Sequence, residues 1–171
     1  MNYNNKFKEK KNAFLKKENI FIFLIILFCV FLDRYTKNEV IINFSENVFF
    51  INDFINIDLI WNTGIGFGFL STESSLIYNL VSVLVGVVIV ILCYFTIISE
   101  VTDKLIYAII IGGAIGNFYD RLIFNAVPDF IDLHYGNFHW FTFNIADIFI
   151  TIGIFAFLMK NFLIKTENEK D

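Results

Sequence analysis

Four long apolar stretches dominate the pattern of the chain, at about residues 19–41, 76–98, 105–124 and 143–163. Each is close to the roughly 20 residues that an α-helix needs to cross the hydrocarbon layer of a membrane. The second stretch carries no charged residue. The pattern therefore predicts an integral membrane protein with four transmembrane helices, and the 57% hydrophobic content of the 171 residues agrees with that class.

Residues 43–75 have a different pattern, which is typical of strands rather than of a membrane helix. Every second position in one part is apolar, namely Ile55, Ile57, Leu59 and Trp61. Asn62-Thr63-Gly64 follows, and then Gly66 and Gly68, which are typical of turns. We therefore predict an all-α membrane protein of four transmembrane helices with a small extracytoplasmic β-sheet between helices 1 and 2. Residues 125–142 are expected to form a second, irregular extracytoplasmic region.

Lysines gather in two tails, predicted at 1–18 and 165–171, whereas 43–75 and 122–142 contain neither lysine nor arginine. Basic segments stay preferentially on the cytoplasmic side of a membrane. We therefore expect both termini in the cytoplasm and both loop regions outside the cytoplasmic (inner) membrane. A cleavable signal peptide is the alternative for the first apolar stretch, but no A-x-A-like site follows and the helical pattern continues through Ile42. A nucleic-acid partner is not expected, because the basic residues lie mainly in the tails.

Six ionisable residues lie at or near the ends of the predicted helices. They are Asp33, Lys37, Asp120, Arg121, Asp129 and Asp147. An ionisable group at membrane depth costs a few kcal/mol or more and so requires a reason. With the orientation above, all six lie toward the outer half of the membrane. This convergence indicates a functional site there.

Two of the helices are expected to meet through these polar residues. Asp33 and Lys37 are four residues apart with the acid first, which favours an ion pair along one helix face. We interpret this pair as structural first and as directly functional second. Asn117 and Arg121 form a polar stripe that must face protein or a wet cavity. Asp120 cannot share the face of Arg121 and is expected to pair elsewhere, toward the first helix.

Two further acids stand where helices end or begin. Pro128 precedes Asp129 and cannot continue the third helix, so we predict that Asp129 lies on irregular backbone near the membrane surface. Asn144 and Asp147 share one face of the first turn of the fourth helix, where the helix dipole favours an acid. Taken singly, either acid has a plainer interpretation as a boundary or helix-start residue.

Together, Asp129 and Asp147 suggest a definite chemistry. If they face each other, repulsion and desolvation raise one pKa, and the pair holds one shared proton. The ionised member can then take a proton from water while the protonated member polarises a carbonyl, which hydrolyses a peptide without a metal or a covalent intermediate. Side-chain amides are candidates to orient the pair or the substrate, namely Asn62, Asn117 and Asn144. Arg121 is a candidate to hold a backbone carbonyl or a lipid headgroup.

Other chemistries fit less well. His134 and His139 form a loose pair in a predicted loop without an H-E-x-x-H motif, which favours an interfacial role over metal binding. A Ser–Lys dyad would need an outward lysine, and the only one, Lys37, has a better partner in Asp33. A proton-coupled small transporter using the same carboxylates is the alternative function, although it would need acids spread through the depth of the membrane. A non-enzymatic membrane subunit would leave these charges without a role.

Five motifs in this order resemble the lipoprotein signal peptidase family, signal peptidase II, over about Ile20 to Ile164. They are Asp33-Arg34-Tyr35-Thr36-Lys37, Asn62-Thr63-Gly64-Ile65-Gly66-Phe67-Gly68, Gly112-Gly113-Ala114-Ile115-Gly116-Asn117-Phe118-Tyr119-Asp120-Arg121, Val127-Pro128-Asp129-Phe130 and Phe143-Asn144-Ile145-Ala146-Asp147. Each motif is moderately specific alone, whereas five in order on four spans are strongly specific. The resemblance assigns residues 19–164 to a single four-span peptidase domain.

The resemblance implies that Asp129 and Asp147 are the catalytic aspartates. The substrate-binding or supporting residues that we take from the same motifs are Asp33, Lys37, Asn62, Gly64, Asn117, Asp120, Arg121 and Asn144. The family cleaves prolipoproteins just before a diacylglyceryl-modified cysteine, uses no metal or other cofactor, and is blocked by globomycin-type cyclic peptides. The implied partners are prolipoproteins and membrane lipids, and the sequence leaves the oligomeric state open.

The sequence departs from the family pattern at three positions. The family usually has alanine at the position of Gly66, glycine at that of Asn125 and a β-branched residue at that of Pro128. The first two are small local changes. Pro128 puts the reach of Asp129 in doubt.

Overall fold

The structure is a computed structural model that describes residues 16–64 and 75–168. Four long helices form a bundle, namely α2 (Lys17–Asn43), α3 (Ser75–Ile98), α4 (Val101–Phe124) and α5 (Ile145–Asn168). Each contains a stretch long and apolar enough to cross a membrane, so the four predicted membrane helices are confirmed. The predicted tail residues 1–15 and 169–171, and the predicted turn glycines Gly66 and Gly68, lie outside the described residues.

Helix α4 forms the centre of the bundle. About half of its membrane-spanning stretch, 56%, is buried inside the protein, compared with 6–17% for the other three helices. Helices α2, α3 and α5 all pack against it. Small residues make this close packing possible: Gly112 and Gly116 face Cys29 and Asp33 of α2, and Gly113 faces the carbonyl of Ala146 in α5. The apolar outer faces of the other helices are left to contact lipid.

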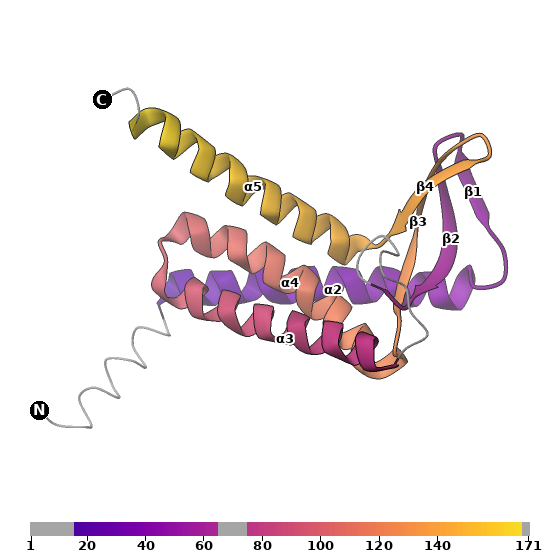
Figure 1. The fold of residues 1–171 in the computed structure, drawn as a ribbon, viewed down its shortest axis with the longest axis horizontal. Helices are drawn as coiled ribbons and strands as arrows, with labels where there is room; N and C mark the ends of the chain where they lie inside the picture. The colour runs from indigo at the N-terminus through magenta and orange to yellow at the C-terminus, as the bar shows by residue number, and fades with distance from the viewer. Residues whose placement is uncertain (1–15, 65–74, 169–171) are drawn as a thin grey trace, which may run out of the picture.

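A four-stranded antiparallel sheet stands at one end of the bundle (Figure 1). Its strands follow the order β1 (Phe49–Asn52), β2 (Ile55–Asn62), β3 (Val127–Tyr135) and β4 (Phe138–Phe143). The predicted sheet between helices 1 and 2 therefore exists, but half of it comes from the connection between α4 and α5, which we wrongly expected to be irregular. Strand β3 lies in the middle of the sheet and is buried along most of its length on both faces. Ile131, Leu133 and Tyr135 do alternate with Asp132 and His134 in the sequence. In β3, however, the two polar residues are buried, the reverse of the usual pattern, and Pro128 had suggested a break in regular structure.

The two hairpins of the sheet close in short turns. The side-chain oxygen of Asn52 accepts hydrogen bonds from the amides of Phe54 and Ile55, at 2.9 and 3.0 Å, in the β1–β2 turn. In the β3–β4 turn, Gly136 has a φ of 58°, a value that hairpin turns require and that glycine adopts without strain. Both hairpins thus have the local chemistry of tight turns.

The prediction of irregular backbone around Asp129 was also wrong. Pro128 is part of β3 and pairs in register with Trp61 of β2. Strand β4 pairs with β3 only from Ile131 onward, so the missing amide hydrogen of Pro128 costs no hydrogen bond to β4. Helix α4 ends at Phe124, as the sequence predicted, and Asn125 follows as its C-cap with a left-handed φ of 53°. Asparagine adopts this conformation more readily than most residues, which explains how Asn125 can stand where the family usually has glycine.

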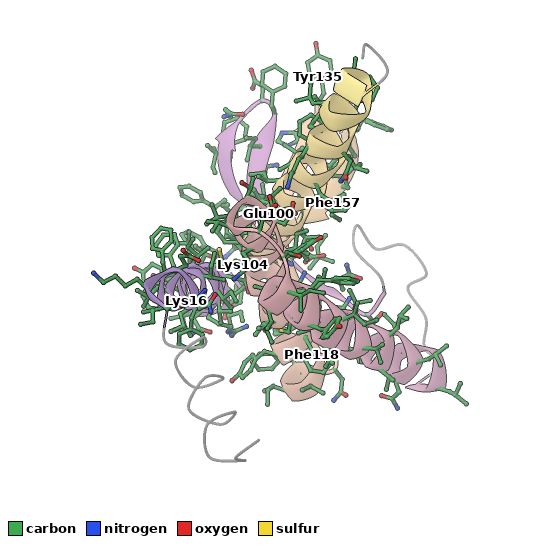
Figure 2. The ribbon with its side chains drawn as sticks, turned by 90° about the vertical axis from the view of Figure 1, so that its left-hand side faces the viewer. Lys16, Glu100, Lys104, Phe118, Tyr135 and Phe157 are labelled. Carbon is green, nitrogen blue, oxygen red and sulfur yellow. The ribbon has the colours of Figure 1, made fainter. Side chains whose placement is uncertain are left out.

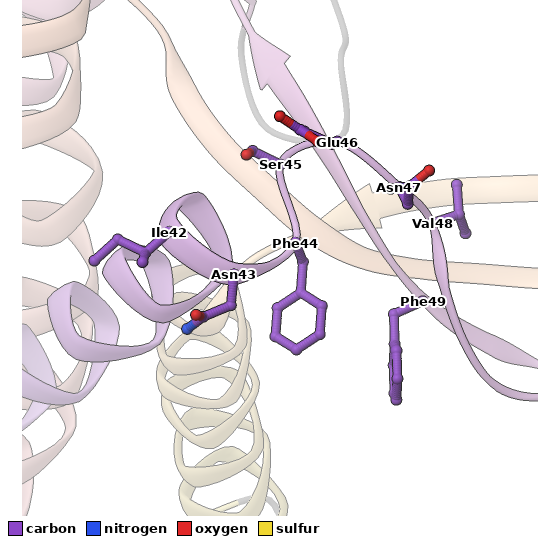
Figure 3. A pocket seen from close by; sticks show the side chains of 8 residues that line it. All are labelled: Ile42, Asn43, Phe44, Ser45, Glu46, Asn47, Val48 and Phe49. Carbon is purple, nitrogen blue, oxygen red and sulfur yellow. The ribbon is translucent and has the colours of Figure 1, made fainter.

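The connection between α2 and β1 surrounds a cavity of about 520 Å³ lined by residues 42–49 (Figure 3). The rings of Phe44 and Phe49 point to the same side of this loop, with their centroids 5.3 Å apart. None of the predicted site residues lines the cavity. It therefore belongs to the loop rather than to the polar site described below.

We predict that Gly116→Ala destabilises the protein by about 1–3 kcal/mol, because the added methyl group would overlap the carboxylate of Asp33. Thermal unfolding in detergent measures the effect. Gly86→Ala is the matched control in α3, where the added methyl would come 3.2 Å from the edge of the Phe118 ring, which can shift. That variant should melt at the same temperature or slightly higher, since alanine favours a helix. Equal losses in both variants would contradict the packing argument.

Candidate active site

Asp129 lies near the start of β3 and is almost completely buried, with 2% of its surface exposed. Its two carboxylate oxygens accept hydrogen bonds from side-chain amides, one from Asn62 Nδ2 at 2.8 Å and one from Asn144 Nδ2 at 2.5 Å. Burial, and then the neighbouring Asp147 carboxylate, raise the pKa of Asp129 to about 7, although both amides favour the ionised form. Asp129 is thus a carboxyl group that can hold a proton near neutral pH.

Asp147 lies in the first turn of α5 and forms a reciprocal cap with Asn144. The Asn144 oxygen accepts the backbone N–H of Asp147 at 3.1 Å, and an Asp147 oxygen accepts the backbone N–H of Asn144 at 3.2 Å. This is the arrangement of a capping box, which satisfies amides that a helix start leaves free. Because the Asn144 amide nitrogen also reaches Asp129, one asparagine joins the two acids that the sequence singled out.

Three asparagines present their amide groups to the two acids, and each is fixed by a donor at its oxygen. The oxygen of Asn144 accepts from Asp147, that of Asn62 accepts from the Gly64 amide at 2.8 Å, and that of Asn117 accepts from Lys37 Nζ at 2.8 Å. Asn117 Nδ2 then donates to Asp147 at 2.8 Å. Since the oxygen of each side chain is already engaged, its NH2 group can point only toward the carboxylate.

A cluster of charges beside the acids joins α2 to α4. The ammonium of Lys37, fully buried, donates to Asp33 at 2.8 Å, to Asp120 at 2.7 Å and to Asn117. The other oxygen of Asp33 accepts the backbone N–H of Ala146 at 2.9 Å, at the N-terminus of α5 where a negative charge is favoured. The predicted Asp33–Lys37 pair and the predicted pairing of Asp120 toward the first helix are both present, within one larger cluster.

Arg121 and Gly64 complete the set of predicted residues. Arg121 donates to the carbonyl of Gly64 at 2.8 Å and to that of Asn117 at 3.3 Å, so it ties the end of β2 to α4. Its Nε has no hydrogen-bond partner in the described part of the chain. The structure therefore brings all ten predicted site residues into one network built from α2, β2, α4, β3 and α5.

Sequence reasoning missed Arg34 as a member of this network. Its guanidinium forms an ion pair with the second carboxylate oxygen of Asp120 and also donates to Asn38 at 2.9 Å. It lies over the ring of Tyr119, 4.9 Å from the ring centroid, where a cation–π contact is favourable. The available signal was its place beside Asp33 at membrane depth, where an arginine needs a partner.

His134 and His139 lie on paired strands rather than in the predicted loop. Their rings stack with centroids 5.5 Å apart, and His139 Nδ1 lies 2.8 Å from a carboxylate oxygen of Asp132. Among the described residues, no group of three histidine, cysteine or acidic side chains is arranged to hold a metal ion. The histidine pair and Asp132 interact with one another and form a feature of the sheet that is separate from the two acids of the site.

The same architecture occurs in solved bacterial membrane enzymes. One, determined by the in meso method at 2.3 Å resolution, has a TM-score of 0.73 and 29% sequence identity over 88% of this chain and 91% of that chain. A second, at 1.9 Å resolution, has a TM-score of 0.67 and 28% identity over 81% of this chain and 90% of that chain. The four membrane helices and the polar network thus define a multi-pass membrane protein of an enzyme class.

Sequence comparisons specify the class. The lipoprotein signal peptidase of Pelagibacter ubique (strain HTCC1062) is 42% identical over 161 residues, which cover 90% of this chain and 96% of that protein. The lipoprotein signal peptidase of Thermodesulfovibrio yellowstonii is 39% identical over 148 residues, 86% of this chain and 95% of that protein. The sequence model described as signal peptidase (SPase) II matches residues 25–163. This chain belongs to the signal peptidase II family and is a peptidase.

We predict that Lys37→Met lowers the free energy of unfolding by about 3–5 kcal/mol, because it leaves two buried carboxylates with one cation fewer. The change is measured by thermal unfolding in detergent. Lys160→Met is the control, since the Lys160–Asp103 pair is partly exposed and should contribute about 1 kcal/mol or less. Similar melting temperatures for the two variants would show that the buried cluster does not stabilise the fold.

Proposed function

We propose that this chain removes signal peptides from diacylglyceryl-modified prolipoproteins, hydrolysing the peptide bond before the lipidated cysteine, with Asp129 and Asp147 as an aspartic dyad. Membership of the signal peptidase II family supports the substrate class, because its relatives are named lipoprotein signal peptidases. The catalytic type rests on the arrangement of the two acids. The roles of the eight supporting residues are part of the same proposal.

The observation that carries the proposal is the composition of the groups around the two acids. In the described part of the chain, every hydrogen bond to their carboxylate oxygens comes from a neutral amide, and no ion pair with a lysine or arginine includes either acid. Two neighbouring carboxylates without a paired cation are stabilised by retaining one proton between them. The pKa of Asp129, raised to about 7 by burial and by the neighbouring carboxylate, supports Asp129 as a group that can hold this proton.

This protonation state supplies both parts of acid–base hydrolysis. The ionised Asp147 takes a proton from a water molecule, which attacks the scissile carbonyl carbon, while protonated Asp129 donates a hydrogen bond to the carbonyl oxygen. When the tetrahedral intermediate collapses, the proton that Asp147 took from water passes to the leaving amine. Asp147 is then ionised and Asp129 protonated, as at the start. The three fixed amides keep both carboxylates oriented throughout.

The proposed orientation places both termini in the cytoplasm and the sheet outside. It is supported by the lysine-rich termini and by the absence of lysine and arginine from 43–75 and 122–142. The start of α2 and the end of α5 lie at the end of the bundle away from the sheet (Figure 1). The dyad then lies at the outer membrane surface, where a lipid-modified substrate arrives laterally. A transporter would use acids spread through the membrane, whereas the cluster and the dyad are joined at the sheet end.

We expect Asp129→Asn and Asp147→Asn each to lower the cleavage rate by about 10²–10⁴, because either change removes one acid–base group. Cleavage of a purified lipidated prolipoprotein in detergent micelles measures the rate. Asp132→Asn is the matched control, a buried acid on the same strand that pairs with His139 instead. Full activity of either dyad variant would exclude the aspartic mechanism, and inactivity of the parent protein would exclude the proposed function.

The reaction should also slow at alkaline pH. Because the pKa of Asp129 is raised to about 7, its protonated form is present below pH 7 and is lost as the pH rises through that value. We expect kcat/KM to fall about tenfold per pH unit well above pH 7. Asn62→Leu should move this decline to higher pH, since the Asn62 amide favours the ionised form. A rate that stays constant to pH 9 would contradict the assignment of the shared proton.

A further inference from the structure

A second cavity, of about 520 Å³, lies at the end of the bundle away from the sheet. It is formed between α2 and α3, with α4 as its floor, and is lined by Lys16, Asn19, Ile22, Phe23, Ile26, Cys93, Thr96, Ile97, Lys104 and Ile111. Its walls are largely apolar and its basic residues are Lys16 and Lys104. We call it the lysine groove. It shares no residue with the candidate active site.

Within residues 16–64 and 75–168, Lys104 is a buried ammonium without an acidic partner. Only 8% of its surface is exposed, and its side chain donates to the neutral oxygen of Asn19 at 3.0 Å. The buried Lys37 has two carboxylate partners, and Lys160 pairs with Asp103, but in the described part of the chain no ion pair includes Lys104. A buried charge is costly unless an opposite charge accompanies it. The lysine groove therefore favours an anion that comes from outside the protein.

The walls indicate that this anion carries a hydrocarbon chain. Phe23 and Ile97, from opposite walls, expose 57% and 64% of their surfaces and open the groove toward the surrounding bilayer. From Lys16 to Ile26, a helix rises about 15 Å, which is half the thickness of the hydrocarbon layer. The groove thus combines a cationic end with an apolar channel about as long as one leaflet is deep.

Figure 2 views this end of the molecule and labels Lys16 and Lys104 near the start of α2. We propose that the lysine groove binds one anionic phospholipid, with its phosphate at Lys104 and Lys16 and an acyl chain between α2 and α3. Helices α2 and α3 each pack on α4, so the bound chain fills the space between them. The leaflet is the cytoplasmic one if the proposed orientation holds, but the binding itself depends neither on that orientation nor on peptide cleavage.

Native mass spectrometry of the purified protein in detergent tests the proposal. The protein is titrated with phosphatidylglycerol, with phosphatidylcholine of the same acyl chains, and with inorganic phosphate alone. We expect one phosphatidylglycerol to bind about fivefold or more tightly than phosphatidylcholine, since each lysine near an anionic headgroup contributes about that factor. Inorganic phosphate should not bind measurably. Equal affinity for the two lipids, or equal binding of phosphate alone, would overturn the proposal.

Variants locate the site. Lys104→Gln should abolish the preference for phosphatidylglycerol and Lys104→Arg should restore it, whereas the control Lys160→Gln should retain it, because Lys160 does not line the groove. Cys93→Trp, which fills one apolar wall, should weaken binding of both lipids. Unchanged selectivity in Lys104→Gln would overturn the assignment. Prolipoprotein cleavage by the same variants serves as a check of folding, and loss of lipid selectivity with cleavage retained separates this inference from the proposed function.

Discussion

The buried ammonium of Lys37 is the interaction on which the polar interior of this protein depends. It uses all three of its protons, two on carboxylates and one on the oxygen of Asn117. The bonds to Asp120 and Asn117 hold α2 against α4, and the carboxylate of Asp33, bound to Lys37 within α2, also accepts a hydrogen bond from the start of α5. The bond to Asn117 also fixes its amide toward Asp147. One cation therefore couples the packing of three membrane helices to the orientation of a catalytic candidate.

Two neighbouring pairs of acids in the interior differ in the groups that surround their carboxylates. In the cluster, the two acids Asp33 and Asp120 form ion pairs with two cations, Lys37 and Arg34, so the formal charges of the cluster cancel. Around Asp129 and Asp147 the donors are neutral amides, which orient carboxylates without compensating their charge. Such an environment favours a proton as the remaining partner. The structural acids and the proposed catalytic acids thus differ in their partners, although the residue type is the same.

The sheet contributes to the site as much as the helices do. Asp129 lies on strand β3, and Asn62 is the last residue of β2. Gly64 follows two residues later, and Arg121 of α4 donates a hydrogen bond to its carbonyl. A hydrogen-bonded sheet limits the movement of these backbones relative to each other, and the capping box fixes the start of α5. The two acids are therefore positioned by regular structure, which favours the precise orientation that hydrolysis requires.

The sequence alone was sufficient for the four membrane helices, because a continuous apolar stretch of about 20 residues is rarely anything but a membrane helix. It also predicted ten site residues, which the structure joins in one network, and nine of them are charged or amide side chains that are costly at membrane depth. It did not reveal strands β3 and β4, because Pro128 suggests a break where the strand in fact continues and because β3 buries its polar residues Asp132 and His134. The sequence interpretation paired Asp33 with Lys37 and Asp129 with Asp147, but it did not establish which cations and which neutral amides surround each acid. That is decided by contacts between residues up to 113 positions apart, which exist only once the helices and the sheet have packed together.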